Sequence, residues 1–165
     1  MTVKLIVAFC KNKGIGKNNK LPWYYSEDLK HFSTLTKGSY NNMILMGRKT
    51  WESLPSKPLP NRFNAILSNH LTIDNENTQT FSSIQDAITF FHEKSFQDLW
   101  IIGGEQIYKT VLDMDIVDEL HISYINENYD CDTYFPYINN KKYRLYLKNN
   151  ISEKIQYQIY IRHRL

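Results

Sequence analysis

A carboxylate and two aromatic rings lie close together near the start of the chain, in a pattern that suits a flat ligand. Asp28 and Phe32 are four residues apart, so a helix would present the carboxylate and the ring on one face. Residues 14–23 precede them, and their glycines, asparagines and proline predict a loop. Unlike an ordinary polar loop it carries apolar side chains, including Trp23, so we expect it to lie over something apolar. The pattern predicts a pocket that grips a flat heterocycle offering N–H donors.

Three predicted strands end in residues suited to binding anions. Gly47-Arg48-Lys49-Thr50 follows the apolar run 43–46 at a helix start, where free backbone N–H groups and two cationic side chains converge. Gly103-Gly104 follows the run 99–102 at another helix start, and Ser68-Asn69-His70 ends a third strand. A glycine pair before a helix is weak evidence alone, because a packing turn is equally compatible. Together these successive strand ends predict a site for one extended diphosphate, and hence for a dinucleotide.

Apolar runs and helical spacing predict the elements that position these residues. Strands are expected at residues 5–10, 43–46, 63–67, 99–102, 119–125 and 155–162. Helices are expected from a Ser26 cap to Gly38, from Gly47 to Leu54, from a Ser82 or Ser83 cap through Phe91, and after Gly104. The predicted fold class is therefore α/β, with a mostly parallel central sheet between two helix layers and an antiparallel C-terminal edge strand. Ligands of such sheets bind beyond the carboxyl ends of the strands.

Length and composition predict one globular domain spanning residues 1–165, because 42% of the 165 residues are hydrophobic and 22% are charged. The apolar run near the N-terminus is too short to span a membrane and lacks a cleavage pattern, so we expect a cytoplasmic protein. Cys10 and Cys131 have no metal-ligand spacing, which predicts free thiols and no metal site. Basic residues gather between positions 141 and 164; a solvated strand face is the favoured interpretation, with nucleic-acid binding as the weaker one.

Short motifs in a characteristic order make this chain resemble the dihydrofolate reductase family over nearly its whole length. The residues that carry the resemblance are Gly14-Ile15-Gly16, Leu21-Pro22-Trp23, Asp28-Leu29 with Phe32, Met46 to Ser53, Pro58 to Arg62, Ile102-Gly103-Gly104 with Tyr108, and Asp132 to Pro136. The five-residue distance from Trp23 to Asp28 is similar to that of bacterial members. The resemblance implies the dihydrofolate reductase fold, an α/β/α arrangement of three layers, in a protein expected to be a monomer.

The resemblance also implies which residues bind the substrate, dihydrofolate. Asp28 matches the buried carboxylate that pairs with the pterin N3 and 2-amino group. Arg62 matches the arginine that binds the α-carboxylate of the glutamate tail, a natural bidentate contact. Ser123 stands where the family has a threonine that bonds this carboxylate and a pterin-bound water. The walls around the pterin and aminobenzoyl rings correspond to Ile6, Ala8, Leu29, Phe32, Leu54, Leu59 and Ile102.

The cofactor implied by the resemblance is NADPH. Arg48, Ser68 and Asn69 fall where the family holds the 2′-phosphate, and Gly103 and Gly104 match a pair joined by a cis peptide. The other implied cofactor contacts are Ala8, Ile15, Gly16, Asn19, Gly47, Lys49, Thr50, Leu67, Ile102, Glu105, Gln106, Ile107 and Tyr108. Gln106 replaces an arginine of some bacterial members. The expected catalytic group comprises Asp28, Trp23, Leu21 and Tyr108.

The implied reaction transfers hydride from C4 of NADPH to C6 of 7,8-dihydrofolate, with a proton from solvent reaching N5. The loop at residues 14–23 is expected to close over the nicotinamide. The product, tetrahydrofolate, serves one-carbon metabolism and thymidylate synthesis. A rival interpretation is an NADPH-dependent reductase of the riboflavin pathway, which should lack Asp28 and the Leu-Pro-Trp segment. A nucleotide-binding module without activity is a second alternative.

Overall fold

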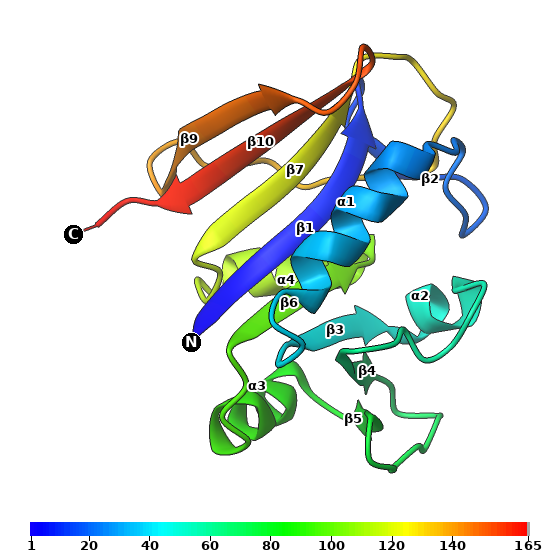
Figure 1. Cartoon of the computed structure of the whole chain (residues 1–165), viewed down its shortest axis with the longest axis vertical. Coiled ribbons are helices and arrows are strands. Elements are labelled where there is room, and N and C mark those ends of the chain that lie inside the picture. The colour runs from blue at the N-terminus through cyan, green and yellow to red at the C-terminus, as the bar shows by residue number, and fades with distance from the viewer. Residues whose placement is uncertain (165) are drawn as a thin grey trace.

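One eight-stranded sheet organises the protein, whose computed structural model describes residues 1–164 (Figure 1). The strands follow the order β5-β4-β3-β6-β1-β7-β10-β9, and a separate ribbon pairs β2 with β8. All pairs from β5 to β7 are parallel, while β7–β10 and β10–β9 are antiparallel. The strands are β1 (Thr2–Cys10), β2 (Gly14–Gly16), β3 (Met43–Gly47), β4 (Phe63–Leu67), β5 (Thr78–Phe81), β6 (Asp98–Gly103), β7 (Glu119–Ile125), β8 (Thr133–Tyr134), β9 (Tyr143–Asn150) and β10 (Ile155–Arg162).

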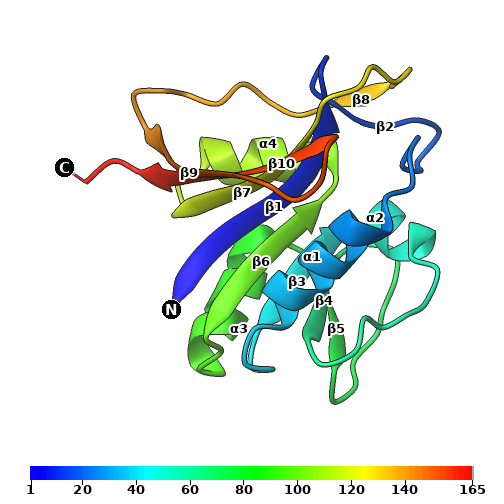
Figure 2. The same ribbon diagram turned by 45° about the horizontal axis from the view of Figure 1, so that its top comes forward.

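Two pairs of helices cover the two faces of the sheet, which confirms the predicted three layers (Figure 2). Alternate residues of β1 point to opposite faces. Leu5 belongs to the core cluster that contains the buried residues of α3 (Ile84–Glu93) and α4 (Glu105–Asp113). Ile6 belongs to the other cluster, where side chains of α1 (Ser26–Lys37) and α2 (Arg48–Ser53) pack. The helix α1, which carries Asp28, therefore packs on an apolar layer of side chains.

Two of the predicted helix ends are confirmed and one predicted cap is wrong. Gly38 ends α1 with a positive φ of 48°, and the Ser83 hydroxyl accepts the Asp86 N–H at 3.1 Å at the start of α3. The N-cap of α1 is Tyr25, whereas Ser26 is already helical. Acidic residues of the first turn still stabilise this end of the helix through its dipole.

Four strands were not predicted from the sequence, namely β2, β5, β8 and β9. β5 has the mostly polar sequence Thr-Gln-Thr-Phe, and it pairs with β4 in parallel. The antiparallel end of the sheet is confirmed, but its edge is β9 rather than the C-terminal strand, because β10 pairs on both sides. β9 is mostly exposed and only Tyr143 is buried in it, so burial of its side chains does not mark this strand.

Both cysteines are buried and free of disulfides, as predicted. None of the helices within residues 1–164 has the length and apolar character required to cross a membrane. A search of the same residues finds no group of His, Cys, Asp or Glu side chains arranged to hold a metal ion.

Candidate active site

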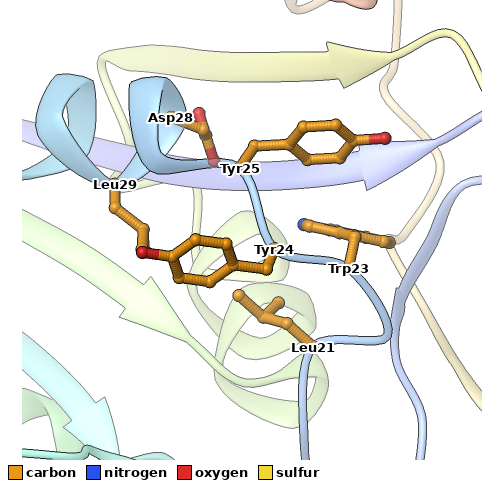
Figure 3. Close-up of a pocket in the computed structure, with 6 residues that line it drawn as sticks. All are labelled: Leu21, Trp23, Tyr24, Tyr25, Asp28 and Leu29. Carbon is orange, nitrogen blue, oxygen red and sulfur yellow. The ribbon is translucent and has the colours of Figure 1, made fainter.

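The predicted loop and the first turns of α1 meet at one small pocket of about 30 Å³ (Figure 3). Figure 3 shows Leu21 and Trp23 arriving from the loop and Asp28 and Leu29 projecting from α1. The pocket is lined by Leu21, Trp23, Tyr24, Tyr25, Asp28 and Leu29. Binding sites for ligands of drug size occupy about 300–1,000 Å³. A bicyclic ligand therefore requires the exposed side chains at the mouth, Leu21, Tyr24 and Leu29, to move aside.

Asp28 is the titratable group of this pocket. Burial raises the pKa of its carboxyl group, while the Ser123 hydroxyl and then His31 lower it and so favour the carboxylate. No Lys or Arg side chain within residues 1–164 forms a salt bridge with Asp28. A buried carboxylate without a cationic partner can hydrogen-bond a ligand that presents adjacent N–H donors.

Most predicted wall residues lie in one apolar cluster beside this pocket. Ile6 is a buried member of the cluster, and its partly buried members include Phe32, Leu54, Leu59 and Ile102. Ala8 packs in a neighbouring cluster with Trp23, and Ser123 is buried on β7, where it pairs with Ala8 in register. Strands β1, β6 and β7 together with both helices of this face therefore bring the predicted substrate residues together.

Aromatic contacts hold Trp23 at the inner end of the loop. Its ring lies 5.2 Å from the Tyr129 ring, measured between centroids, and the Tyr129 hydroxyl bonds the Tyr25 hydroxyl at 2.5 Å. The Trp23 side chain is buried, and its Nε1 has no hydrogen-bond partner within residues 1–164. Tyr129 was not predicted to belong to the site, because it lies about a hundred residues from the loop that it anchors.

The rest of the loop is docked on the segment around β8. Gly14 and Gly16 pair with Tyr134 and Thr133, and Ile15 packs against the core. The Asn18 N–H donates to the Asp132 carboxylate at 3.0 Å, and Asn19 adopts a left-handed φ of 62°. These contacts fix the loop beside the strand ends, where the predicted cofactor residues lie.

The two glycine-containing turns predicted to bind a diphosphate converge in space. A Cβ added to Gly47 would lie 3.4 Å from Ile107 at the start of α4, and one added to Gly103 or Gly104 would lie 3.6 Å from Thr50 on α2. The Gly103–Gly104 peptide is cis, as the resemblance implied. The two turns are thus close enough to contact one extended anion, and at Gly103 the positive φ of 129° also favours glycine.

Polar residues at the neighbouring strand ends complete the predicted cofactor set. Arg48 is half-exposed and pairs with Glu52 at 2.8 Å, one helical turn further on. The Ser68 hydroxyl oxygen, just beyond Leu67 at the end of β4, accepts the N–H groups of His70 and Leu71 and keeps its own hydrogen to donate. Lys49, Asn69 and Gln106 are exposed and available to a ligand.

Tyr108 connects the two strands that flank the pocket. Its hydroxyl lies 2.8 Å from the Ile6 carbonyl oxygen and 2.9 Å from that of Ile102, and donates to them. Burial raises the pKa of this hydroxyl, so it stays protonated. Tyr108 therefore positions the carbonyl edges of β1 and β6 at the site.

Arg62 is a buried cation whose side chain contacts only neutral acceptors. Its Nε donates to the Pro60 carbonyl oxygen at 2.8 Å and its Nη1 to the Thr36 hydroxyl at 3.0 Å. No carboxylate within residues 1–164 pairs with it, and burial lowers its pKa. Arg62 also borders a hollow of about 250 Å³, which Leu59, Pro60 and Glu76 line as well. This arrangement suits an anionic group on a ligand.

Two polar residues have surroundings that the sequence did not indicate. The Glu105 carboxylate accepts the Tyr134 N–H at 2.6 Å, which ties the start of α4 to β8. His31 lies three residues after Asp28 on α1, and its Nε2 is buried without a partner within residues 1–164. The three-residue spacing of His31 from Asp28 was visible in the sequence, whereas the Glu105 contact depends on tertiary structure.

The fold and this site are those of an α/β protein whose candidate ligand-binding residues lie at the carboxyl ends of parallel strands, and the comparisons with known proteins identify its family. The profile of the family described as dihydrofolate reductase matches residues 2–164. A dihydrofolate reductase of Aedes albopictus is 33% identical over 164 residues, with 92% of this chain and 88% of that protein covered. One of Heliothis virescens is 31% identical over 154 residues, covering 87% and 83%. The chain belongs to the dihydrofolate reductase family.

Some relatives are longer proteins. A bifunctional dihydrofolate reductase-thymidylate synthase of Paramecium tetraurelia is 41% identical over 133 residues, which are 81% of this chain and 28% of that protein. The chain therefore spans just over a quarter of the length of such relatives. These matches are to eukaryotic proteins, and the likeness to bacterial members in the Trp23–Asp28 spacing stays a prediction.

Proposed function

We propose that the protein reduces 7,8-dihydrofolate to 5,6,7,8-tetrahydrofolate with NADPH. Family membership supports the reaction and the cofactor. The observation that carries the proposal is the partly buried carboxylate of Asp28, which forms no salt bridge with any other residue up to position 164 and lies in a pocket framed by aromatic and aliphatic side chains. A pterin presents its N3–H and 2-amino group side by side, and a carboxylate can accept both hydrogen bonds.

The residues that are predicted to contact the cofactor fit NADPH. Arg48, Ser68 and Asn69 offer charge and donors to a 2′-phosphate, and the converging glycine turns fit the diphosphate. Bound NADPH supplies the hydride, which passes from C4 of the nicotinamide to C6 of dihydrofolate. Tyr108 holds the carbonyl edges between which the nicotinamide would lie, and the loop with Leu21 and Trp23 would cover it and exclude water.

The chain itself supplies position and electrostatics rather than a proton donor at N5. Asp28 binds the far edge of the pterin, and its negative charge favours the N5-protonated substrate in a site of low dielectric constant. The proton reaches N5 from solvent through the opening bordered by Leu21. Holding the two rings in contact contributes up to about 7–11 kcal/mol in ideal cases.

Arg62 and the hollow beside it support recognition of the glutamate tail. Its guanidinium group lies beyond the apolar wall formed by Phe32, Leu54 and Leu59, at the end of α1 remote from Asp28. We propose that it binds the α-carboxylate, so that dihydrofolate is held by a carboxylate at one end and a cation at the other.

We further propose that residues 1–165 act as one catalytic domain of a cytoplasmic monomer. The free, buried thiols support a reducing compartment. Nucleic-acid binding by the basic C-terminal segment is disfavoured, because Lys142 pairs with Asp115, Lys154 pairs with Glu127, and Arg162 donates to the Val117 carbonyl oxygen. The match to the dihydrofolate reductase family and the presence of Asp28 also disfavour the riboflavin-pathway reductase.

A direct test is the oxidation of NADPH, followed by its absorbance, after dihydrofolate is added to the purified protein. We expect oxidation that depends on both compounds, together with quenching of tryptophan fluorescence when dihydrofolate binds near Trp23. Binding without turnover would favour the non-catalytic module, and binding of neither compound would refute the proposal.

A further inference from the structure

A chain of polar side chains runs beneath α1, away from the Asp28 pocket. The Glu119 carboxylate lies 2.8 Å from His121 Nε2, and His121 Nδ1 lies 2.5 Å from the Tyr157 hydroxyl. The Tyr157 ring in turn meets the His31 ring edge to face, with centroids 4.2 Å apart at 73°. His31 and Asp28 are three residues apart on α1, so the chain leads from the sheet to the proposed pterin site.

The hydrogen-bond directions in this chain follow from the chemistry of the groups. Interaction with His121 and Lys4 lowers the pKa of Glu119, which is therefore a carboxylate and only accepts. His121 Nε2 must then carry a hydrogen and donate it to Glu119. In the neutral ring Nδ1 has no hydrogen, so Tyr157 donates its hydroxyl hydrogen to Nδ1.

The chain cannot conduct protons as a continuous relay. His31 Nε2 is buried and has no hydrogen-bond partner within residues 1–164, and the contact between His31 and Tyr157 is one of rings. The link to Asp28 is therefore electrostatic.

We infer that His31 is a positioning residue for Asp28, held by Tyr157 and the His121–Glu119 pair so that the Asp28 carboxylate stays ionised for pterin binding. The inference rests on the proposed function, because it assigns His31 a part in the same site. As the pH falls, an imidazole takes up a proton before a carboxylate does. A protonated His31 beside Asp28 then opposes protonation of the carboxylate, which would otherwise lose its hold on the pterin.

Burial and the neighbouring charged groups act on His31 in opposite directions. Burial lowers the pKa of His31, Asp28 raises it, and His121 lowers it, so that the balance between the two histidines depends on Asp28. The titratable and charged groups that face this region are Glu27 and Asp28 of α1, Lys4 of β1, Asp98 of β6, Glu119 and His121 of β7, and Tyr157 of β10. Lys4 pairs with Asp98 at 3.1 Å and is 4.0 Å from Glu119, so its charge is already compensated.

The test is a ¹³C NMR titration of the Asp28 carboxyl group in the ligand-free protein, with its signal assigned by its loss in Asp28→Asn. His31→Gln removes the ionisable ring, and His31→Phe removes the charge while retaining the aromatic contact with Tyr157. We expect both to raise the Asp28 midpoint by about half a pH unit or more. Lys30→Gln is the matched control, because it removes a cation from the exposed face of the same helix and should shift the midpoint by at most about 0.2 unit.

The same variants should change the reaction in a way that a structural defect would not. The loss of kcat/KM for dihydrofolate on acidification should begin at a higher pH, while kcat at higher pH is retained. An Asp28 midpoint that is unchanged or lower in both His31 variants would overturn the inference. The titration needs neither substrate nor cofactor, so it tests the role of His31 independently of the reaction. Failure of the wild type to reduce dihydrofolate would instead refute the proposed function.

Discussion

Asp28→Asn should abolish most hydride transfer while leaving the fold intact. The asparagine side chain has the same shape but no charge, and its amide group opposes one of the two N–H donors of the pterin edge. Removing one partner of a buried, hydrogen-bonded charge pair costs about 2–5 kcal/mol. Since about 1.4 kcal/mol is a tenfold change, kcat/KM for dihydrofolate should fall about 30- to 4,000-fold at neutral pH.

The free energy of unfolding should change in the opposite direction. Burial raises the pKa of Asp28 in the folded state, so the carboxylate destabilises the native protein once it is ionised. This penalty is absent at low pH and appears as the pH rises from the unfolded-state pKa of Asp28 through the raised folded-state pKa. Asp28→Asn removes it, so we expect a thermal midpoint at neutral pH equal to or above that of the wild type.

The assay pairs steady-state NADPH oxidation with thermal unfolding, using Glu27→Gln as the matched control. Glu27 is the neighbouring carboxylate on α1 and does not line the pocket, so its loss should leave kcat/KM within about twofold of the wild type. Wild-type turnover by Asp28→Asn would refute the assigned role. An equal loss in both variants would show that overall charge at the start of the helix, rather than the pocket carboxylate, is responsible.

Three further substitutions test the remaining parts of the site. Arg62→Ala should raise KM for dihydrofolate about 30- to 140-fold with little effect on NADPH, and equal binding of a pterin lacking the glutamate tail would identify the lost contact. Arg48→Ala should weaken NADPH binding about tenfold and leave NADH binding unchanged; equal effects on both would contradict a 2′-phosphate contact. Glu105→Ala should speed proteolysis within residues 14–23 about tenfold by freeing β8, whereas Glu105→Gln, which keeps an acceptor for Tyr134, should not. Identical proteolysis rates in the two Glu105 variants would show that the hydrogen bond from the Tyr134 N–H to Glu105 does not hold the loop in place.

The sequence predicted the strands whose apolar side chains are buried in the protein. The apolar runs of β3 and β4 and the C-terminal alternation of β10 indicate strands because their residues pack against helices or neighbours on the sheet. β2 and β8 are only three and two residues long and exist because they pair with each other. Strands of this kind depend on a tertiary partner, which periodicity does not reveal.

The site was predicted to the extent that it follows from strand ends and helix faces. Asp28 and Phe32 share a face of α1, and the glycine turns open α2 and α4, so local spacing was sufficient. His31 has the same favourable spacing, but its significance depends on Tyr157, which reaches it from the far end of the chain. A contact between residues so far apart in the sequence depends on the packing of α1 over β7 and β10, which the sequence did not reveal.

The central claim is that this chain joins the nicotinamide and the pterin in one site for hydride transfer. The most direct measurement is mass spectrometry and NMR of the folate product formed with NADPH that carries deuterium at the transferred C4 position. We predict tetrahydrofolate with one deuterium at C6, and about 30- to 4,000-fold less of it when Asp28→Asn replaces the wild type at a low dihydrofolate concentration and the same brief reaction time. Product without deuterium, or deuterium at a carbon other than C6, would contradict the account.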